Sequence, residues 1–124
     1  MKVLLSIKPE YADKILSGKK RFEFRKTIFK NPDVSTVVIY ATMPVGKVIG
    51  EFSIEKILSS CPAGIWDLTS EFAGISHGFF NEYFSGRSRA YAIKIKQATR
   101  YKRPLSLSEL LPNGVAPQSF RYLP

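Results

Sequence analysis

Four charged side chains, Lys20, Arg21, Glu23 and Arg25, fall within one short stretch that follows Gly18. Successive side chains of a strand point to opposite faces, so Arg21, Glu23 and Arg25 would share one face of a strand. A carboxylate between two guanidinium groups can hold both in place, and a fixed guanidinium recognises phosphates, carboxylates and base edges. The same pattern is also typical of an edge strand with a solvated charged face. Both interpretations are open on this pattern alone.

Lys20 and Glu23 differ in strand parity, so they share a site only if Lys20 lies in the loop before the strand. The position of Lys20 two residues after Gly18, a natural helix cap, allows this placement. We then expect Lys20 to contact phosphate as a point charge and Arg25 to bind it through two parallel hydrogen bonds. Lys20 and Glu23 are also candidate catalytic residues.

The charge of the chain is concentrated in two segments. The formal net charge is +9; residues 1–30 carry nine basic and three acidic side chains, and residues 87–103 carry seven basic and no acidic ones. The intervening residues 31–86 have two basic and six acidic side chains. If the fold brings the two basic segments together, they form the positive face of a nucleic-acid-binding protein. The alternative is a generally basic small protein.

Length and composition narrow the class of protein. A chain of 124 residues with 44% hydrophobic residues predicts one domain over residues 1–124 with a real core. No apolar run approaches the ~20 residues of a membrane helix, and the N-terminal apolar run is too short for a signal peptide. The single cysteine, Cys61, excludes an internal disulfide and a cysteine-based metal site. We therefore expect a cytoplasmic protein without metal or cofactor.

Hydrophobic periodicity and turn residues predict an α+β fold. Pro9 suits the first turn of a helix, and the apolar run Val37 to Ile39 is typical of a central strand that is buried on both faces. We expect a small, closed β-barrel of five to six strands with peripheral helices, because closure removes exposed sheet edges. The expected strands cover 2–7, 20–28, 34–42, 47–58 and 88–98; the expected helices cover 9–17, 62–73 and a short stretch between Ser76 and Gly86, and 105–111 may form a helical turn.

The spacing Gly18-x-Lys20-x-x-Glu23-x-Arg25 resembles the signature of ASCH domains, the activating signal cointegrator homology group of the PUA-like superfamily. The context is also similar, from Ser6-Ile7-Lys8-Pro9 through Tyr83-Phe84-x-Gly86 to Pro117-Gln118-Ser119-Phe120. The resemblance spans nearly the whole chain. It implies a PUA-like barrel that binds RNA or a nucleotide in a cleft beside the first helix and the motif strand.

Some relatives implied by this resemblance are enzymes. One group deacetylates N4-acetylcytidine and resembles this chain at Lys20, but it has a threonine nucleophile where this sequence has Glu23. A glutamate cannot replace a threonine hydroxyl in forming the same acyl intermediate. The resemblance implies that the acid that this group carries on a helix corresponds to Glu71, a third candidate catalytic residue. Another relative is described as a ribonuclease, so cleavage of a phosphodiester is also open.

We therefore favour an RNA- or nucleotide-binding domain, with a hydrolase and a protein-interaction module as alternatives. A protein partner and the oligomeric state stay open. The only histidine, His77, could act as an acid or base but is more often structural in such a position. Strand tyrosines are candidates for stacking on bases. The expected nucleic-acid-binding residues are Lys8, Lys19, Lys20, Arg21, Glu23, Arg25, Tyr40, Arg89, Tyr91 and Lys94.

Overall fold

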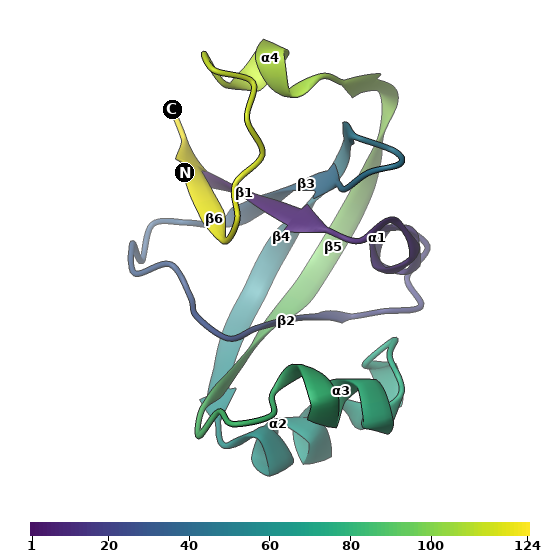
Figure 1. Ribbon diagram of the computed structural model, residues 1–124, viewed down its shortest axis with the longest axis vertical. Helices are drawn as coiled ribbons and strands as arrows, with labels where there is room; N and C mark the ends of the chain where they lie inside the picture. Colours follow the sequence, from purple (N-terminus) through teal and green to yellow (C-terminus); the bar gives the residue numbers. More distant parts are fainter.

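The computed structural model describes all residues 1–124 and is an α+β fold, as expected (Figure 1). None of its helices is long and apolar enough to cross a membrane. The strands are β1 (Lys2–Ile7), β2 (Phe22–Arg25), β3 (Thr36–Ala41), β4 (Lys47–Ser60), β5 (Ala90–Leu105) and β6 (Phe120–Leu123). The helices are α1 (Pro9–Leu16), α2 (Pro62–Thr69), α3 (His77–Tyr83) and α4 (Leu107–Leu110), and a 3-10 turn, η1 (Ser70–Phe72), follows α2.

The six strands form one mixed sheet in the order β2-β5-β4-β3-β1-β6. Strands β1 and β3 are parallel, with α1 and β2 in the connection between them, and the other neighbouring pairs are antiparallel. The long strands β4 and β5 run together along the molecule, and α2 and α3 lie at one end of them (Figure 1). The C-terminal tail returns as β6 and pairs antiparallel with β1.

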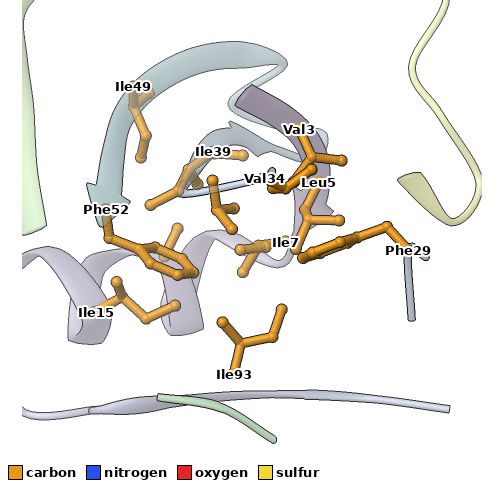
Figure 2. Close-up of a cluster of buried hydrophobic side chains, with 13 residues drawn as sticks. Val3, Leu5, Ile7, Ile15, Phe29, Val34, Ile39, Ile49, Phe52 and Ile93 are labelled. Carbon is orange, nitrogen blue, oxygen red and sulfur yellow. The ribbon is translucent and has the colours of Figure 1, made fainter. Parts of the chain in front are cut away.

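The main core lies inside the curved sheet and is closed by α1 (Figure 2). Alternate residues of β1, which are Val3, Leu5 and Ile7, point into it, as the period of two of a strand requires. Ala12 and Ile15 of α1 pack against them. A second cluster joins β2 to α2 and α3, and a third covers the opposite face of β1 and β3. The site described below depends on the first two clusters, because they fix α1, β2 and α3.

The expected closed barrel is wrong in one respect, because the sheet does not close. Strands β2 and β6 stay at its two edges and are not paired with each other. Strand β2 has only four residues, and its ladder is formed with β5 alone. The gap is bridged by the Arg25 side chain, which donates hydrogen bonds to the carbonyl oxygens of Ser119 at 2.7 Å and Ser6 at 3.5 Å. A side chain thus replaces the missing strand pairing.

Two expected strands and one helix have different lengths in the structure. Strand β2 is shorter than predicted, and the helix expected over 62–73 divides into α2 and η1. Strand β5 continues through Pro104, which we expected to lie beyond the strand. Proline is tolerated where a strand is irregular, and the register between β4 and β5 shifts between the pairs Val48–Leu105 and Gly50–Arg100. Pro104 lies within that irregular segment.

Candidate functional site

A cleft of about 270 Å³ opens between the end of β1, the start of α1, strand β2 and the region of α3. Its wall combines cations, one carboxylate and several aromatic rings. Such a mixture is typical of a site for a small, partly aromatic ligand, because apolar surface supplies contact area and a few polar groups fix orientation. The lining residues are Ser6, Ile7, Lys8, Tyr11, Lys20, Glu23, Phe24, Arg25, Ile75, Phe79 and Tyr83.

Lys20 lies in the bend between α1 and β2, outside the strand expected over 20–28, and so meets the condition for sharing a site with Glu23. Gly18 ends the helical segment with a φ of +82°, a left-handed conformation that glycine adopts without strain. The Lys20 side chain is only 2% exposed, and its Nζ donates a hydrogen bond to the carbonyl oxygen of Ala73 at 2.8 Å. The same nitrogen lies 4.5 Å from the centre of the Phe24 ring. Lys20 is therefore a buried cation at the base of the cleft.

Burial lowers the pKa of Lys20 from 10.5 to about 8, because water no longer stabilises its charged form. The negative charge of Glu23 opposes this effect, while the neighbouring cation Lys14 adds to it. A lysine with such a pKa is mainly a cation at neutral pH but has a significant neutral fraction. It can therefore attract an anion or, in its neutral form, accept a proton.

The backbone at Gly74 makes room for Lys20. Gly74 has a φ of +70°, and a Cβ built there would lie 2.5 Å from both Cβ and Cγ of Lys20. Neither the backbone conformation nor the space suits another residue. Lys14 also donates a hydrogen bond to the Gly74 carbonyl oxygen at 3.1 Å. The carbonyl oxygens of Ala73 and Gly74 thus accept hydrogen bonds from Lys20 and Lys14.

Glu23 and Arg25 form a largely buried ion pair on β2, with Arg25 Nη1 at 3.4 Å from Glu23 Oε2. Both terminal nitrogens of Arg25 already donate to protein acceptors, since Nη2 bonds the Ser119 carbonyl oxygen. This arrangement favours a structural role for Arg25 over the expected two-bond contact with phosphate. The ion pair holds Glu23 in place, and Glu23 Oε1 accepts no hydrogen bond from the protein.

Aromatic rings form the side of the cleft that faces α1 and α3. Tyr11 and Phe79 have their ring centres 5.7 Å apart, and Lys8 Nζ lies 5.4 Å from the centre of Phe79. Burial raises the pKa of both Tyr11 and Tyr83; nearby carboxylates add to this effect, and Arg25 opposes it at Tyr83, so both phenols stay protonated at neutral pH. The Tyr83 hydroxyl donates to the Phe24 carbonyl oxygen at 3.5 Å, and the Tyr11 hydroxyl offers a hydrogen-bond donor beside a flat apolar surface.

Helix α3 is held in place by a hydrogen bond at its N-terminus and by aromatic packing on its buried face. The Ser76 hydroxyl accepts a hydrogen bond from the Phe79 backbone N–H at 3.1 Å and so caps the start of the helix. Phe80 is fully buried, and its ring centre lies 5.1 Å from that of Phe24 and 4.8 Å from that of Phe84. This packing ties α3 to β2, so Phe79 is presented to the cleft by a fixed helix.

Four of the ten expected nucleic-acid-binding residues line the cleft: Lys8, Lys20, Glu23 and Arg25. The two basic segments do lie side by side, since β2 pairs with β5 and the Ile95 N–H donates to the Arg21 carbonyl oxygen at 3.0 Å. Their cations, however, do not converge on the cleft. Lys94 is engaged by Glu55 at 2.8 Å, and Arg89 bonds the Ser59 hydroxyl at 2.8 Å.

Tyr40 and Arg21 lie elsewhere. Tyr40 is 7% exposed and belongs to the cluster on the opposite face of β1 and β3, so the stacking role that we expected for it does not fit its position. Arg21 makes no ion pair with Glu23; its guanidinium lies over the Phe72 ring, 4.7 Å from its centre. The remaining expected residues outside the cleft are Lys19 and Tyr91.

The other catalytic candidates also lie outside the cleft. Glu71 is exposed in η1 and does not line the cleft. His77 is exposed as well, and its ring stacks on Trp66 with centres 4.5 Å apart and planes 4° from parallel. Of the four residues considered for catalysis, only Lys20 and Glu23 reach the site.

Sequence reasoning did not identify Tyr11, Phe79 and Tyr83 as site residues. Tyr11 is half-buried on α1 and faces the cleft. Ser76 is a preferred residue type for the start of a helix, so the sequence could locate Phe79 in the first turn of α3. The side of the helix that faces a cleft depends on the packing of Phe80, which sequence alone does not give.

Comparisons with known proteins show the family of the chain and agree with its fold. A family model described as "ASCH domain" matches residues 5–99. The chain is 33% identical over 123 residues to the "ASCH domain-containing ribonuclease" of Zymomonas mobilis subsp. mobilis, covering 97% of this chain and 82% of that protein. It is 34% identical to the "Crystal structure of ASCH from Zymomonas mobilis", with a TM-score of 0.91 and coverage of 99% and 87% of the two chains.

A further relative is much longer than this chain. The "Large ribosomal subunit protein uL22" of Ureaplasma parvum serovar 3 is 32% identical over 123 residues, and the match covers 98% of this chain but 39% of that protein. The chain thus spans well under half of the length of this relative. The family model and the Zymomonas protein together are sufficient for the assignment, and the chain belongs to the ASCH domain family.

Proposed function

We propose that this protein binds RNA, with one nucleotide held in the cleft around Lys20. The single observation that carries the proposal is the composition of the cleft, where Lys8 and Lys20 lie beside the rings of Tyr11, Phe79 and Tyr83. Lysines attract phosphate, and aromatic side chains stack on bases of any identity. The name of the Zymomonas relative, a ribonuclease, supports RNA over other polyanions.

Glu23 gives the proposed site a hydrogen-bond acceptor among its cations. Its Oε1 is free of protein partners, while Oε2 is held by Arg25. A carboxylate in such a position accepts hydrogen bonds from the amino or imino groups of a base and repels phosphate. We therefore place the base near Glu23 and the phosphate near Lys8, whose side chain is exposed at the edge of the cleft.

The second candidate is a ribonuclease that uses the same cleft, and the observation that favours it is the lowered pKa of Lys20. A neutral Lys20 amine could take the proton of a ribose 2′-hydroxyl, whose oxygen would then attack the adjacent phosphorus and expel the 5′-oxygen, which gains a proton from water. General-base action of this kind contributes about 100-fold or more to a rate. The deacetylation of acetylcytidine is less favoured, because Glu23 occupies the place of the threonine nucleophile.

Paired binding and turnover assays of the wild type, Glu23→Gln and Lys20→Ala distinguish these functions. In a binding protein, Glu23→Gln preserves shape and changes the affinity for short single-stranded RNA by about 1–2 kcal/mol, with no turnover in any variant. In an enzyme, both substitutions lower the rate of RNA cleavage about 100-fold or more while binding survives. Acetylated cytidine serves as a second substrate. Wild-type RNA affinity that neither substitution changes would refute the assignment of this cleft.

A further inference from the structure

A second hollow, of about 360 Å³, lies behind the bend that carries Lys20. It is bounded by the C-terminal end of α1, the residues that lead into β2 and the middle of β5 (Figure 1). The two hollows share one residue, Lys20, whose amine belongs to the cleft. The lining residues of the second hollow are Ile15, Leu16, Ser17, Gly18, Lys20, Arg21, Ile95, Lys96, Gln97 and Ala98.

The second hollow has positive charge without an acidic residue in its wall. Arg21 and Lys96 are exposed and make no ion pair. Lys19, in the bend beside them, is also exposed and unpaired. By contrast, two other cations of β5 are neutralised, Lys94 by Glu55 and Arg100 by Asp13. Positive charge is therefore left unneutralised at this hollow.

The backbone N–H groups of Lys19 and Lys20 are not available to bind an anion in the second hollow. An anion there must therefore be bound by side chains. The N–H groups of Lys19 and Lys20 both donate to the Lys14 carbonyl oxygen, at 2.9 and 3.0 Å. The guanidinium of Arg21 is held over Phe72 at 4.7 Å, and its donors have no protein acceptor. A guanidinium restrained on one face keeps its edge available for phosphate.

From these features we propose that the second hollow continues the RNA path, so that a strand with one nucleotide in the cleft crosses the bend at residues 19–21 and places its next nucleotide there. This inference rests on the proposed function of the cleft. The partly buried side chains of Leu16, Ile95 and Ala98 give the hollow an apolar floor for the face of a base or sugar, and Arg21 and Lys96 meet the phosphates. The ligand is therefore a single strand of at least two nucleotides, and its recognition is largely electrostatic.

The test compares a mononucleotide with a short oligouridylate in titrations at several salt concentrations. The variant Arg21→Gln/Lys96→Gln removes two charges from the second hollow. The matched control, Lys47→Gln/Lys102→Gln, removes two exposed, unpaired charges that line neither hollow. Each phosphate contact contributes about −0.7 to the log–log salt slope of single-strand binding.

We expect the hollow variant to make the oligonucleotide salt slope less negative by about 1.4 units and to weaken its binding about fivefold, because each exposed contact is modest. Mononucleotide binding should stay at the wild-type value, which also shows that the cleft is intact. The control should leave the slope unchanged. Equal effects of the hollow variant and the control on the oligonucleotide would overturn the proposed path.

A cleft variant separates this inference from the proposed function. Lys20→Ala should weaken both the mononucleotide and the oligonucleotide. If Lys20→Ala weakens neither, the proposed function of the cleft fails. If Lys20→Ala has no effect but Arg21→Gln/Lys96→Gln lowers the affinity for the oligonucleotide, the second hollow binds RNA by itself. That result would refute the continuous path as well.

Discussion

Replacement of Lys20 by methionine should change the pH dependence of the free energy of unfolding. Methionine keeps much of the unbranched side chain but cannot be charged. In the folded protein the pKa of Lys20 is about 8, against 10.5 for an exposed lysine. The folded pKa is the lower one, so the charged amine destabilises the fold. This penalty is present in full below about pH 8 and disappears as the pH rises towards 10.5.

The magnitude follows from linkage between proton binding and folding. Between about pH 7 and about pH 10, the two pKa values of Lys20 imply that the wild-type free energy of unfolding rises by about 2.5 kcal/mol relative to Lys20→Met. The loss of the hydrogen bond to the Ala73 carbonyl oxygen does not vary with pH in the variant, so it cancels from this difference. Other titrating groups cancel as well, because both proteins contain them.

Urea unfolding of the two proteins at four pH values measures this difference. Lys19→Met is the matched control, since Lys19 is adjacent but exposed, and its stability should follow the wild type at every pH. Parallel curves for the wild type and Lys20→Met would refute the reasoning, because they would show that the Lys20 amine is as well solvated in the folded protein as in the unfolded chain.

Three further substitutions test the supports of the site. Gly74→Ala should destabilise the protein by about 2–4 kcal/mol in chemical denaturation, from its positive φ and its contact with Lys20, and a neutral effect would contradict the described packing. Arg25→Lys should speed hydrogen exchange around Ser119, because a lysine cannot make all the bonds of the guanidinium that bridges the sheet edges; unchanged exchange would mean that the bridge is dispensable. Burial raises the pKa of Glu51, but its hydrogen bonds outweigh this effect and lower the pKa overall. The ionised carboxylate therefore stabilises the fold, and this contribution is lost as the pH falls through the lowered pKa. Glu51→Gln should accordingly make thermal stability depend less on pH on the acid side of the profile. A profile that keeps its full slope would exclude this role.

The location of the site could be predicted from the sequence, whereas the burial of its side chains and their distant partners could not. The motif drew attention to Lys20 and Glu23, and the structure brings both to the cleft because β2 begins after Lys20. Its burial, however, depends on Ala73 and Gly74, more than 50 residues away, which no local pattern connects to Lys20. The role of Arg25 is similar, because its partner Ser119 lies 94 residues further along the chain.

The fold could be predicted to the level of its class and most of its elements. Alternation along a strand shows which residues share a face, but not which face carries the cleft. Tyr40 shares this ambiguity, and the structure places it in the core on the opposite face of the sheet. Closure into a barrel was inferred from a general tendency, whereas the actual edges depend on the short β2 and on the Arg25 bridge.

The central claim is that RNA occupies the cleft around Lys20. A titration of isotope-labelled protein with a short single-stranded RNA, followed by NMR, tests it most directly because the shifted signals locate the ligand. The account predicts that the largest shifts fall on Lys8, Tyr11, Lys20, Phe79 and Tyr83, which come from three separate segments of the chain. Shifts confined to residues outside the cleft, or no shifts at RNA concentrations that saturate binding, would contradict it.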